Sequence, residues 1–447
     1  MSCHEYHCPC FLLGLSLGKV VIEGKTKVVY EVPAHPGQVL LVSKDRITAG
    51  DGARSHDLEG KAAISTATCA KIFEFLNNAG VKTHFIRQHG EKSFLARHCD
   101  MVPIEWVTRR VATGSFLRRH VGVKEGFRFC PPKQETFFKD DENHDPQWSY
   151  EQLIDAKLDI GGHVIGADEV AIMERMTLCV FEILEHAWQS LNCSLIDMKV
   201  EFGIDKETGE ILLADIIDSD SWRLWPAGDK RLMKDKQVYR DLKTVTSEAL
   251  DTVKRNFAWV AEQSLHPKPH ARAVIVMGSP TDLSYGEKIG KVLKSLAIPY
   301  DIRVSSAHKG TDATLRILAD YEVSIMDSCL GIPTVFIAIA GRSNGLGPVL
   351  AGNSTWPVIN APPLTPEWAS EDVWSSLRLP SGIGCGTVIT PDGAAVAAAQ
   401  MLALSDHVVW SNLRAKQLNT WVGLKMADQD LVKKLQAQNE GVANGVH

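Results

Sequence analysis

Two segments in the first half of the chain place charged residues at spacings that suit phosphate chemistry. Residues 102–115 (VPIEWVTRRVATGS) form an apolar, strand-like run that ends in two arginines and a Gly-Ser turn. Guanidinium groups bind phosphate or carboxylate through paired hydrogen bonds, and glycine lets such an anion approach the backbone. Residues 195–203 (LIDMKVEFG) alternate as a strand does, with Asp197, Lys199 and Glu201 on one side. A lysine flanked by two carboxylates on one strand face suits a nucleotide with its metal ion.

Two further features of this half add to the same chemistry. The turn EGKTK offers Gly24, Lys25 and Lys27, a glycine and two cations that suit phosphate, although a plain charged hairpin turn has the same composition. Asp215 lies on the strand that follows Glu201. Carboxylates on adjacent strands suit Mg²⁺, and a surface hairpin with cross-strand charges is the alternative.

Three polar loops in the second half each follow a predicted apolar strand. Loops at the carboxyl ends of strands in an open parallel sheet converge on one ligand crevice. Imidazole moves protons near neutral pH, so His308 is the candidate acid–base group, although a histidine at a strand end is often only structural. A helix N-cap is the alternative for the first loop. The remaining candidates in these loops are Gly278, Ser279, Asp282, Ser306, Lys309, Gly341 and Ser343.

Length and composition limit the class of protein. A chain of 447 residues predicts two or three domains. The net charge of −6 and the isoelectric point of about 6.2 argue against a nucleic-acid-binding protein, which is normally basic. The ten cysteines are scattered without a repeated spacing, which indicates free thiols in a reducing, cytoplasmic protein. No apolar run approaches the roughly 20 residues of a membrane span, so we expect no membrane partner.

Hydrophobic periodicity predicts a different fold on each side of residues 261–271, a proline-bearing stretch that is typical of a linker. Before it, strands and helices are segregated, which favours an α+β domain at residues 18–260. After it, apolar strands alternate with helices, which favours an α/β domain with a three-layer parallel sheet of the flavodoxin type at residues 272–435. The expected strands are 20–23, 28–32, 39–42, 81–87, 195–203, 211–217, 273–277, 300–304 and 334–340, and the expected helices are 58–79, 169–189, 283–296, 311–321, 394–404 and 406–425.

The two ends of the chain lie outside these domains. Residues 1–17 carry a cluster of cysteines and histidines and then a short apolar run. A zinc site lacks a second ligand pair at finger-like spacing, and a signal peptide lacks a basic start and a cleavage site. We therefore expect a disordered extension at residues 1–17 and a C-terminal tail at residues 436–447.

The motifs of the first half closely resemble those of the SAICAR synthetase family, which begins with a Glu-Gly-Lys-Thr-Lys hairpin over ATP. This resemblance implies an α+β ATP-binding domain that uses ATP and Mg²⁺ to join aspartate to a carboxylated aminoimidazole ribotide. It implies Gly24, Lys25, Lys27, Lys199 and Glu201 at ATP, and Glu201 and Asp215 at the metal. Arg110 is less favoured than Arg109, since adjacent strand residues face opposite ways. The residues that it implies at the imidazole substrate are Asp45, Lys61, Arg109, Ser115, Asp220, Ser221 and Arg223.

The three loops of the second half resemble those of the class II aminoimidazole ribotide carboxylase family. This resemblance implies carboxylation by CO₂ without ATP, biotin or metal, with His308 as the proton-moving group and Lys309 beside substrate. It also implies a homo-octamer. Residues 323–330 (VSIMDSCL) depart from the family pattern, which has a short polar turn there, and this puts packing and carboxylase activity in doubt.

The resemblance spans residues 18 to 433 and predicts a bifunctional purine-pathway enzyme with small-molecule partners. A catalytically impaired homologue that serves as an assembly subunit is the alternative from another class, and the retained His308, Lys199, Glu201 and Asp215 argue against it. A kinase is a third possibility, but the chain lacks the HRD and DFG motifs of protein kinases. Whether the intermediate is shared between the two sites stays open.

Overall fold

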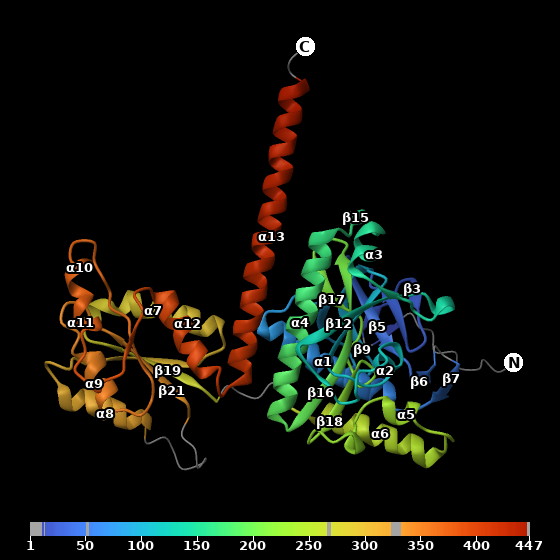
Figure 1. Cartoon of the computed structure of the whole chain (residues 1–447), viewed down its shortest axis with the longest axis horizontal. Helices are drawn as coiled ribbons and strands as arrows, with labels where there is room; N and C mark the ends of the chain where they lie inside the picture. The colour runs from blue at the N-terminus through green and yellow to red at the C-terminus, as the bar shows by residue number, and fades with distance from the viewer. Residues whose placement is uncertain (1–10, 13, 51–52, 266–269, 323–331, 445–447) are drawn as a thin grey trace. The chain divides into compact units, whose positions relative to one another are not determined.

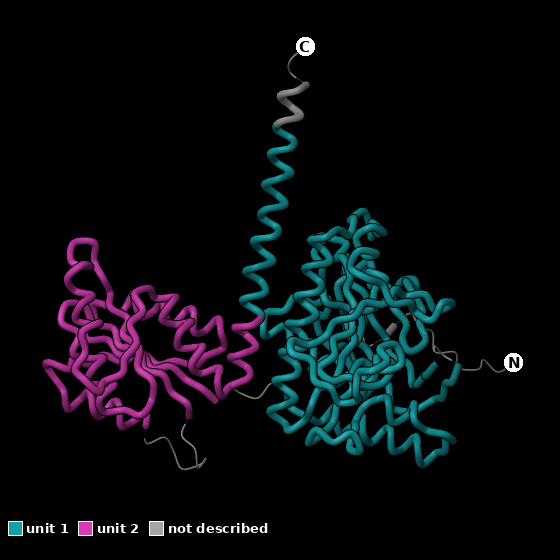
Figure 2. Tube along the Cα trace, viewed as in Figure 1, with its two compact units in different colours: residues 1–265, 415–447 teal, residues 266–414 magenta. Residues whose placement is uncertain are grey.

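The computed structural model describes residues 11–12, 14–50, 53–265, 270–322 and 332–444. The chain forms two compact units, coloured separately in Figure 2. The first comprises Met1–Leu265 and Ala415–His447, and the second comprises His266–Arg414. The division after Leu265 falls inside the expected linker. Of that linker, residues 261–262 belong to a helix and residues 266–269 lie outside the described part of the chain.

The first unit begins with an antiparallel five-stranded sheet in the order β3-β4-β5-β9-β8. Helix α1 (Lys61–Ala79) packs against it through a face that includes Cys69, Ile72, Phe73 and Leu76. Gly80 ends this helix in the left-handed conformation that favours glycine. The predicted strands and helix therefore form, with the last strand starting later than expected. The strands are β3 (Val20–Glu23), β4 (Lys27–Glu31), β5 (Gln38–Ser43), β8 (Phe85–Gln88) and β9 (Ser93–Arg97).

A second antiparallel sheet is built around the long strand β16 (Cys193–Asp205). Helix α4 (Ala167–Ser190) packs on it with the predicted apolar face, which includes Val170, Met173 and Val180 (Figure 1). The expected hairpin with the following strand is confirmed, since Glu201 lies opposite Ala214. The other strands are β10 (Cys99–Met101), β11 (Ile104–Val111), β12 (Arg128–Phe138), β13 (Gln147–Trp148), β17 (Ile211–Ala214) and β18 (Trp222–Pro226).

Smaller elements complete the first unit and carry several site residues. Together with the two sheets they make the α+β fold that the sequence predicts. These elements are β1 (Phe11–Leu12), β2 (Leu15–Ser16), β6 (Arg46–Ala49), β7 (Arg54–Asp57), β14 (Asp159–Ile160), β15 (His163–Val164), α2 (Ser115–Arg119), α3 (Tyr150–Asp155), α5 (Gln237–Arg240), α6 (Ser247–Glu262) and the short helices η1 (Asp141–Asn143) and η2 (Lys230–Leu232).

The second unit is a parallel sheet in the order β20-β19-β21-β22-β23, which is the strand order 2-1-3-4-5 of flavodoxin-like folds. The α/β prediction is confirmed. The strands are β19 (Arg272–Met277), β20 (Tyr300–Val304), β21 (Thr334–Ile339), β22 (Val358–Asn360) and β23 (Gly386–Thr387), and the helices are η3 (Pro280–Asp282), α7 (Leu283–Ser295), α8 (Thr311–Glu322), α9 (Leu346–Gly352), α10 (Ala369–Asp372), α11 (Trp374–Leu377) and α12 (Pro391–Leu402).

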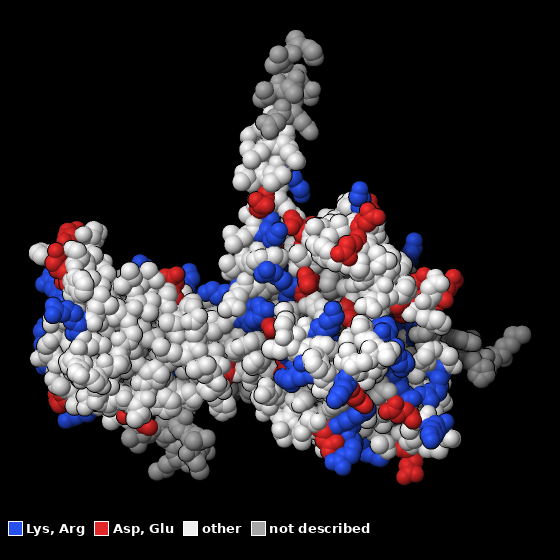
Figure 3. Space-filling view, in the orientation of Figure 1, with Lys and Arg blue, Asp and Glu red and all other residues white. Residues whose placement is uncertain are grey.

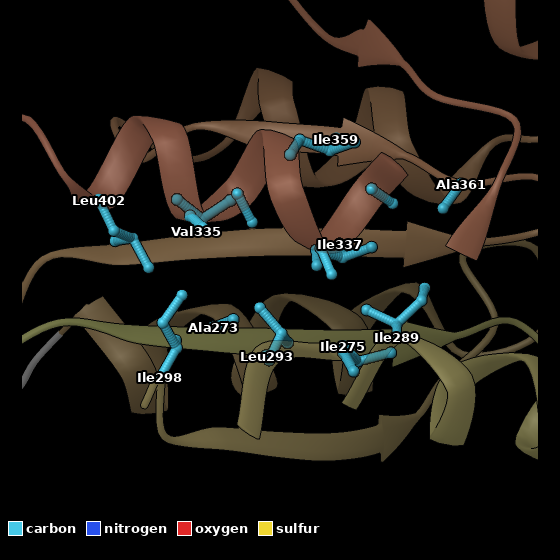
Figure 4. Close-up of a cluster of buried hydrophobic side chains, with 14 of the residues drawn as sticks. Ala273, Ile275, Ile289, Leu293, Ile298, Val335, Ile337, Ile359, Ala361 and Leu402 are labelled. Atoms are coloured by element: carbon cyan, nitrogen blue, oxygen red, sulfur yellow. The ribbon is translucent and has the colours of Figure 1, made fainter. Parts of the chain in front are cut away.

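Alternate residues of the central strands fill a core on each face of this sheet. Ile275 and Ile337 pack against α7 and α12 (Figure 4), whereas Val276 and Phe336 pack on the side of α8 and α9. Strands buried on both faces read as continuous apolar runs, which is why β19 and β21 contain almost no polar residue. Each fully buried side chain of this kind contributes roughly 1.5–3 kcal/mol. The rigid sheet holds the loops at its carboxyl edge.

The chain ends differ from expectation. Leu15 is 9% exposed and packs with Val32, Leu40 and Leu95, so residues 14–17 are not the disordered extension that the sequence predicts. The Cys/His cluster of residues 1–10 and the stretch 323–330 lie outside the described residues. Helix α13 (His407–Asn444) continues through most of the expected tail, because residues 426–440 contain many helix-forming residues and no proline.

Candidate active sites

A cavity of about 1770 Å³ opens in the first unit between its sheets and surrounding loops. Its walls come from the β3–β4 hairpin, the inward face of β11 and β16, and the loop before β18. Asp197, Lys199 and Glu201 all line it, so the alternation of residues 195–203 does place them on one face. The predicted site residues that line this cavity are Gly24, Lys25, Lys27, Lys61, Arg109, Ser115, Lys199, Glu201, Asp215, Asp220, Ser221 and Arg223.

Two residues that the sequence analysis considered, Asp45 and Arg110, do not line this cavity. The structure does not bring Asp45 into the cavity: its carboxylate accepts hydrogen bonds from the Ala62 amide at 2.8 Å and from Lys92 at 2.7 Å. Asp45 therefore accepts from a free amide in the first turn of α1 from outside the helix, since the N-cap residue Gly60 has no side chain to do so. Arg110 donates two hydrogen bonds to Glu185 on α4, each of 2.6 Å, so it faces away from its neighbour Arg109.

The wall beneath the β3–β4 hairpin carries lysines paired with carboxylates. Lys199 contacts Glu201, lies 3.8 Å from Asp215, and donates to Glu105 at 3.1 Å. Burial opposes charge on Lys199, but Glu201 and Glu105 outweigh it and hold the pKa of Lys199 above its ordinary value. Burial likewise opposes charge on Glu201, but Lys199, Lys139 and Lys27 lower its pKa to about 2. Both groups are therefore ionised at neutral pH.

The two candidate metal ligands face the same lysines. Asp215 contacts Lys27, and it adopts a left-handed backbone conformation with φ of 62°. Such a conformation is uncommon outside glycine, asparagine and aspartate, and here it turns the carboxylate toward the cavity. Burial lowers the pKa of Lys27 to about 8, against the attraction of Glu201. Lys139 donates to Glu201 at 2.8 Å.

A buried ion-pair network forms the adjacent wall. Arg109 is 4% exposed and donates through Nε to Glu135 and, at 2.9 Å, through Nη1 to Asp197. Asp197 is also bonded by Arg223, and Glu135 by Arg119 at 2.7 Å. Burial would raise the pKa of Glu135, but the two arginines outweigh it and lower that pKa. Two edges of the Arg109 guanidinium are thus held by protein carboxylates.

Gly114 makes the approach of Arg223 to this wall possible. Its φ is 60°, and a Cβ at this position would lie 2.6 Å from Nη2 of Arg223. Ser115 follows as the first residue of α2 and lines the cavity. The Gly-Ser turn that the sequence singled out therefore brings an arginine, a hydroxyl and a helix start together.

An acidic pair with two lysines forms the floor near α1. Lys61 is 3% exposed and donates to Asp220 at 3.0 Å, and Lys236 lies 3.5 Å from the same carboxylate. Burial opposes charge on Lys61, but Asp220 and Asp218 outweigh it and raise its pKa. Burial and the neighbouring Asp220 raise the pKa of Asp218. Ser221 donates to the Ile216 carbonyl at 3.0 Å, which fixes the loop.

In the second unit the three candidate loops begin side by side at the carboxyl edge of the sheet. Gly278 donates to the Ile339 carbonyl at 2.8 Å, and Ser305 donates to the Met277 carbonyl at 2.9 Å. Ser279 accepts from the Thr281 amide at 3.3 Å and so caps η3. Burial raises the pKa of Asp282. The starts of the 278–282, 305–310 and 340–347 loops are therefore neighbours, as the order β20-β19-β21 in the sheet requires.

His308 lies against the third of these loops. A Cβ at Gly345 would be 2.8 Å from Nε2 of His308, so the imidazole lies close to the backbone of this glycine. The Ser306 carbonyl accepts from the amides of Lys309 at 3.2 Å and Gly310 at 2.9 Å, which forms the turn that presents His308. His308 and Lys309 are both exposed.

The loop that carries Gly341 and Ser343 has an internal hydrogen bond and one unusual backbone conformation. The Ser343 carbonyl accepts from the Gly345 amide at 3.0 Å. Arg342, between the two predicted residues, has a φ of 52°. A non-glycine residue in this region marks a loop whose conformation is fixed by its surroundings.

Sequence reasoning missed several charged residues that line the first cavity or lie directly behind its wall. Glu135 and Lys139 lie on or beside β12, where Lys133, Glu135 and Phe137 alternate and could have signalled a second polar strand face. Lys236 and Arg240 follow a loop that has no periodic pattern. Their place in the cavity comes from long-range packing that the local sequence does not encode.

The described residues contain no group of three or more His, Cys, Asp or Glu side chains that could hold a metal ion. Mg²⁺ in nucleotide sites needs only one or two carboxylates, since phosphate oxygens and waters complete its octahedron. Glu201 on β16 and Asp215, the residue directly after β17, reach the same Lys199, so this pair of ligands fits such an ion. None of the helices in the described ranges combines the length and apolar character that a bilayer span requires.

The fold and these residues define a class of two-unit proteins with one candidate active-site region in each unit. One is a cavity lined by lysines, arginines and carboxylates, which suits polyanionic substrates, and the other is a histidine-bearing loop edge of a parallel sheet.

Comparison with known proteins agrees with this class. A family model for SAICAR synthetase matches residues 20–256, and one for AIR carboxylase matches residues 272–421. The bifunctional phosphoribosylaminoimidazole carboxylase/phosphoribosylaminoimidazole succinocarboxamide synthetase of Drosophila melanogaster is 61% identical over 94% of this chain and 96% of its own. The Homo sapiens protein of that name is 59% identical over 93% and 97%.

Two solved structures each match part of the chain. A SAICAR synthetase (type 2) in complex with ADP covers 54% of this chain and 98% of its own, at 33% identity and a TM-score of 0.47. Treponema denticola PurE covers 36% and 96%, at 35% identity and a TM-score of 0.32. The chain belongs to the family of bifunctional phosphoribosylaminoimidazole carboxylase/succinocarboxamide synthetases, enzymes of purine biosynthesis in which a ligase domain precedes a lyase domain.

Proposed function

We propose that the first unit makes SAICAR from 4-carboxy-5-aminoimidazole ribotide, L-aspartate and ATP. The substrate carboxylate attacks the γ-phosphorus of ATP, the bond to the β-phosphate oxygen breaks, and ADP leaves. The aspartate amine then attacks the carbonyl of the acyl phosphate, and phosphate departs as the amide forms. No protein nucleophile is required, so the protein contributes position and charge.

The observation that carries this proposal is the convergence of three lysines on one wall of the large cavity. Lys27, Lys139 and Lys199 contact Glu201 or Asp215 directly below the hairpin that holds Gly24 and Lys25. Gly24 and Lys25 approach the phosphates of ATP, and Lys27 and Lys199 balance their charge. The cavity has the volume to hold a nucleotide and a ribotide together.

The imidazole substrate takes the remaining part of the cavity. Arg109, Ser115 and Arg223 form the wall suited to its phosphate or carboxylate, and Lys61, Asp220 and Ser221 form the floor suited to ribose and amine. Asp45 acts from behind α1 by holding the start of the helix that carries Lys61. Glu201 and Asp215 hold Mg²⁺, which neutralises phosphate charge when it is bound.

We propose that the second unit carboxylates 5-aminoimidazole ribotide with CO₂ and needs no metal or organic cofactor. The electrons of the ring enamine form the new C–C bond, and His308 then takes the proton from the same carbon, which restores the aromatic ring. Gly278, Ser279, Asp282 and Ser306 hold the ribotide, Lys309 neutralises its charge, and the Gly341 and Ser343 segment holds CO₂. The contact of His308 with Gly345 supports this arrangement.

We also propose that the enzyme is a cytoplasmic homo-octamer assembled through its second unit. Much of the face of that unit seen in Figure 3 carries no charged side chain. Trp368, Trp374 and Leu377 are each at least half exposed, which is unusual for large apolar side chains that no other chain covers. Cys69 and Cys193 are free thiols, which suits a reducing compartment. Mass photometry of the full chain tests the octamer, and a monomer would contradict it.

We propose that the synthetase domain comprises residues 18–260 and the carboxylase domain residues 272–435.

A two-stage assay tests both activities. Aminoimidazole ribotide and bicarbonate are supplied first, and carboxylated ribotide is expected; ATP and aspartate are then added, and SAICAR and ADP are expected. ADP release without aspartate would indicate a kinase, and no product in either stage would leave an assembly subunit. Lys199→Met should stop only the second stage. His308→Asn should stop the first stage, and SAICAR should still form when carboxylated ribotide is supplied directly.

A further inference from the structure

A buried polar cluster lies behind the loop that faces His308. Asn344 and Asn360 are 4% and 0% exposed, and Ser376 is fully buried. The side-chain amide of Asn344 donates to Oδ1 of Asn360 and to Oγ of Ser376, both at 2.9 Å. Nδ2 of Asn360 donates to the Ser376 carbonyl at 3.2 Å. Uncompensated burial of such groups costs about 1–3 kcal/mol each, so the complete pairing fixes one arrangement.

This cluster is tied to the loop at both ends. Oδ1 of Asn344 accepts from the Gly347 amide at 3.1 Å, and the Asn344 amide donates to Ser375 at 3.1 Å. A Cβ at Gly347 would lie 1.7 Å from Oδ1 of Asn360, so the start of α9 rests directly on that side chain. Asn360 in turn is the last residue of β22 and belongs to the rigid sheet.

The segment that the cluster holds is the one that meets the imidazole. Gly345 lies between Asn344 and the start of α9, and a Cβ there would be 2.8 Å from Nε2 of His308. Arg342, two residues before Asn344, keeps a left-handed backbone. Such a conformation persists where the surrounding structure determines it, and the paired amides supply that constraint.

We propose that Asn344 and Asn360 are positioning residues for the carboxylation. They transmit the fixed geometry of the sheet to residues 343–345 and so keep the CO₂-binding segment at one distance from His308. Neither side chain touches the reacting atoms. The inference rests on the proposed role of His308. A fixed loop raises the rate of proton removal only if the proton acceptor acts on a substrate that this loop holds. A displacement of about 1 Å at a reacting centre can lower a rate on the order of a hundredfold.

The test compares variants of this cluster in the full chain. Asn360→Ala and Asn344→Ala remove the link between sheet and loop. Thr387→Val is the matched control: the Thr387 hydroxyl donates to the same Ser376 carbonyl at 2.9 Å and accepts from Nδ2 of Asn360 only at 3.5 Å, and it makes none of the described hydrogen bonds that reach Asn344. The synthetase rate of each sample measures the amount of intact chain, and the thermal midpoint of the second unit confirms that it is folded at the assay temperature. Should Asn360→Ala fail to fold, Asn344→Ser, whose hydroxyl is too short to bridge Asn360 and Ser376, replaces it.

We expect Asn360→Ala and Asn344→Ala to lower the carboxylase kcat about ten- to a hundredfold with KM for the ribotide within about threefold. The kinetic isotope effect with ribotide deuterated at the reacting carbon should rise, since proton removal becomes slower, whereas loss of folded enzyme leaves that ratio unchanged. Thr387→Val should stay within about threefold of the unmodified rate. Equal kcat losses in Asn360→Ala and Thr387→Val, with an unchanged isotope effect, would overturn the positioning role. Carboxylase activity retained by His308→Asn would instead overturn the proposed role of His308.

Discussion

The buried position of Arg109 predicts that its replacement destabilises the first unit before it affects substrate binding. Arg109 is 4% exposed and lies between Glu135, whose side chain is fully buried, and Asp197, whose side chain is 6% exposed. Arg109→Met keeps most of the side-chain volume and removes the charge. It leaves two buried carboxylates that each lose one of their arginine partners.

The stability lost on Arg109→Met depends on the arginine partners that the two carboxylates keep. Breaking a buried ion pair by removing one partner costs about 3–5 kcal/mol. Glu135 keeps Arg119 at 2.7 Å and Asp197 keeps Arg223, so we expect the lower end, about 3 kcal/mol. In a domain of this size that loss lowers the thermal midpoint by roughly 6–12 °C.

The pH dependence has a definite sign. Arg109 and Arg119 hold the folded-state pKa of Glu135 below its ordinary value of 4.5, against the effect of burial. A depressed carboxylate pKa stabilises the fold above the unfolded-state pKa and loses that contribution as the pH falls through the folded-state value. The destabilisation by Arg109→Met should therefore be complete at pH 7 and become smaller below about pH 4.5.

Calorimetry of the full chain provides the measurement, since the transition of the second unit serves as an internal reference. Arg110→Met is the matched control: its partner Glu185 is 15% exposed, and the pair lies outside the cavity. We expect that control to lose less stability than Arg109→Met, because Glu185 keeps Arg128 at 3.8 Å and part of its contact with water. Arg109→Met with Glu135→Gln should lose less than the sum of the single changes, because the two side chains share one interaction.

One result would refute this reasoning. If Arg109→Met left the unfolding free energy within about 0.5 kcal/mol of the unmodified chain and raised KM for the carboxylated ribotide tenfold, Arg109 would act on the substrate alone and not in the stability of the fold. The ion pairs with Glu135 and Asp197 would then contribute nothing net to the fold.

Three further outcomes follow from single positions. Burial raises the pKa of Asp235 to about 6, so the folded state keeps a proton that the unfolded chain releases near pH 4. Urea unfolding should therefore show up to about 3 kcal/mol of stability lost as the pH rises through 6. Asp235→Asn should lack this pH dependence of the unfolding free energy. Gly345→Ala places a Cβ 2.8 Å from Nε2 of His308 and should lower the carboxylase rate at least about tenfold while SAICAR formation continues; an unchanged carboxylase rate would contradict the contact. The Cβ added by Gly114→Ala would lie 2.6 Å from Nη2 of Arg223, at a residue whose φ is +60°. This variant should therefore lower the unfolding free energy by more than about 1 kcal/mol. Equal stability by calorimetry would show that Arg223 lies elsewhere.

Strand alternation made part of the first site predictable. Because side chains on a strand alternate between faces, residues 195–203 could place Asp197, Lys199 and Glu201 on one side without knowledge of any partner strand. The same rule separated Arg109 from Arg110. It could not identify Glu135 as the partner of Arg109, since that contact depends on β11 pairing with β12 across a long connection.

Local turn chemistry was a weaker guide. Asp45 begins a loop with the composition of a binding turn, but its carboxylate holds the Ala62 amide at the start of α1. Short acidic side chains serve both roles with the same local sequence, and only the tertiary position separates them. For the same reason Asn344 and Asn360 have no sequence signal: their partners come from β22, α9 and α11, which meet only in the folded sheet.

The paired lysines of the first cavity explain how one wall can bind a polyanion and still release it. Lys27, Lys139 and Lys199 are held by Glu201 and Asp215 before any nucleotide arrives, so the conformational entropy of each long side chain, up to about 2 kcal/mol, is lost on folding and not on binding. A phosphate that accepts hydrogen bonds from these lysines replaces a carboxylate that already did so. The net gain is then the difference between two charge-assisted interactions and not the whole of one. In the proposed reaction, that difference would favour specific placement of ATP over very tight binding, because the site would have to release ADP in every cycle.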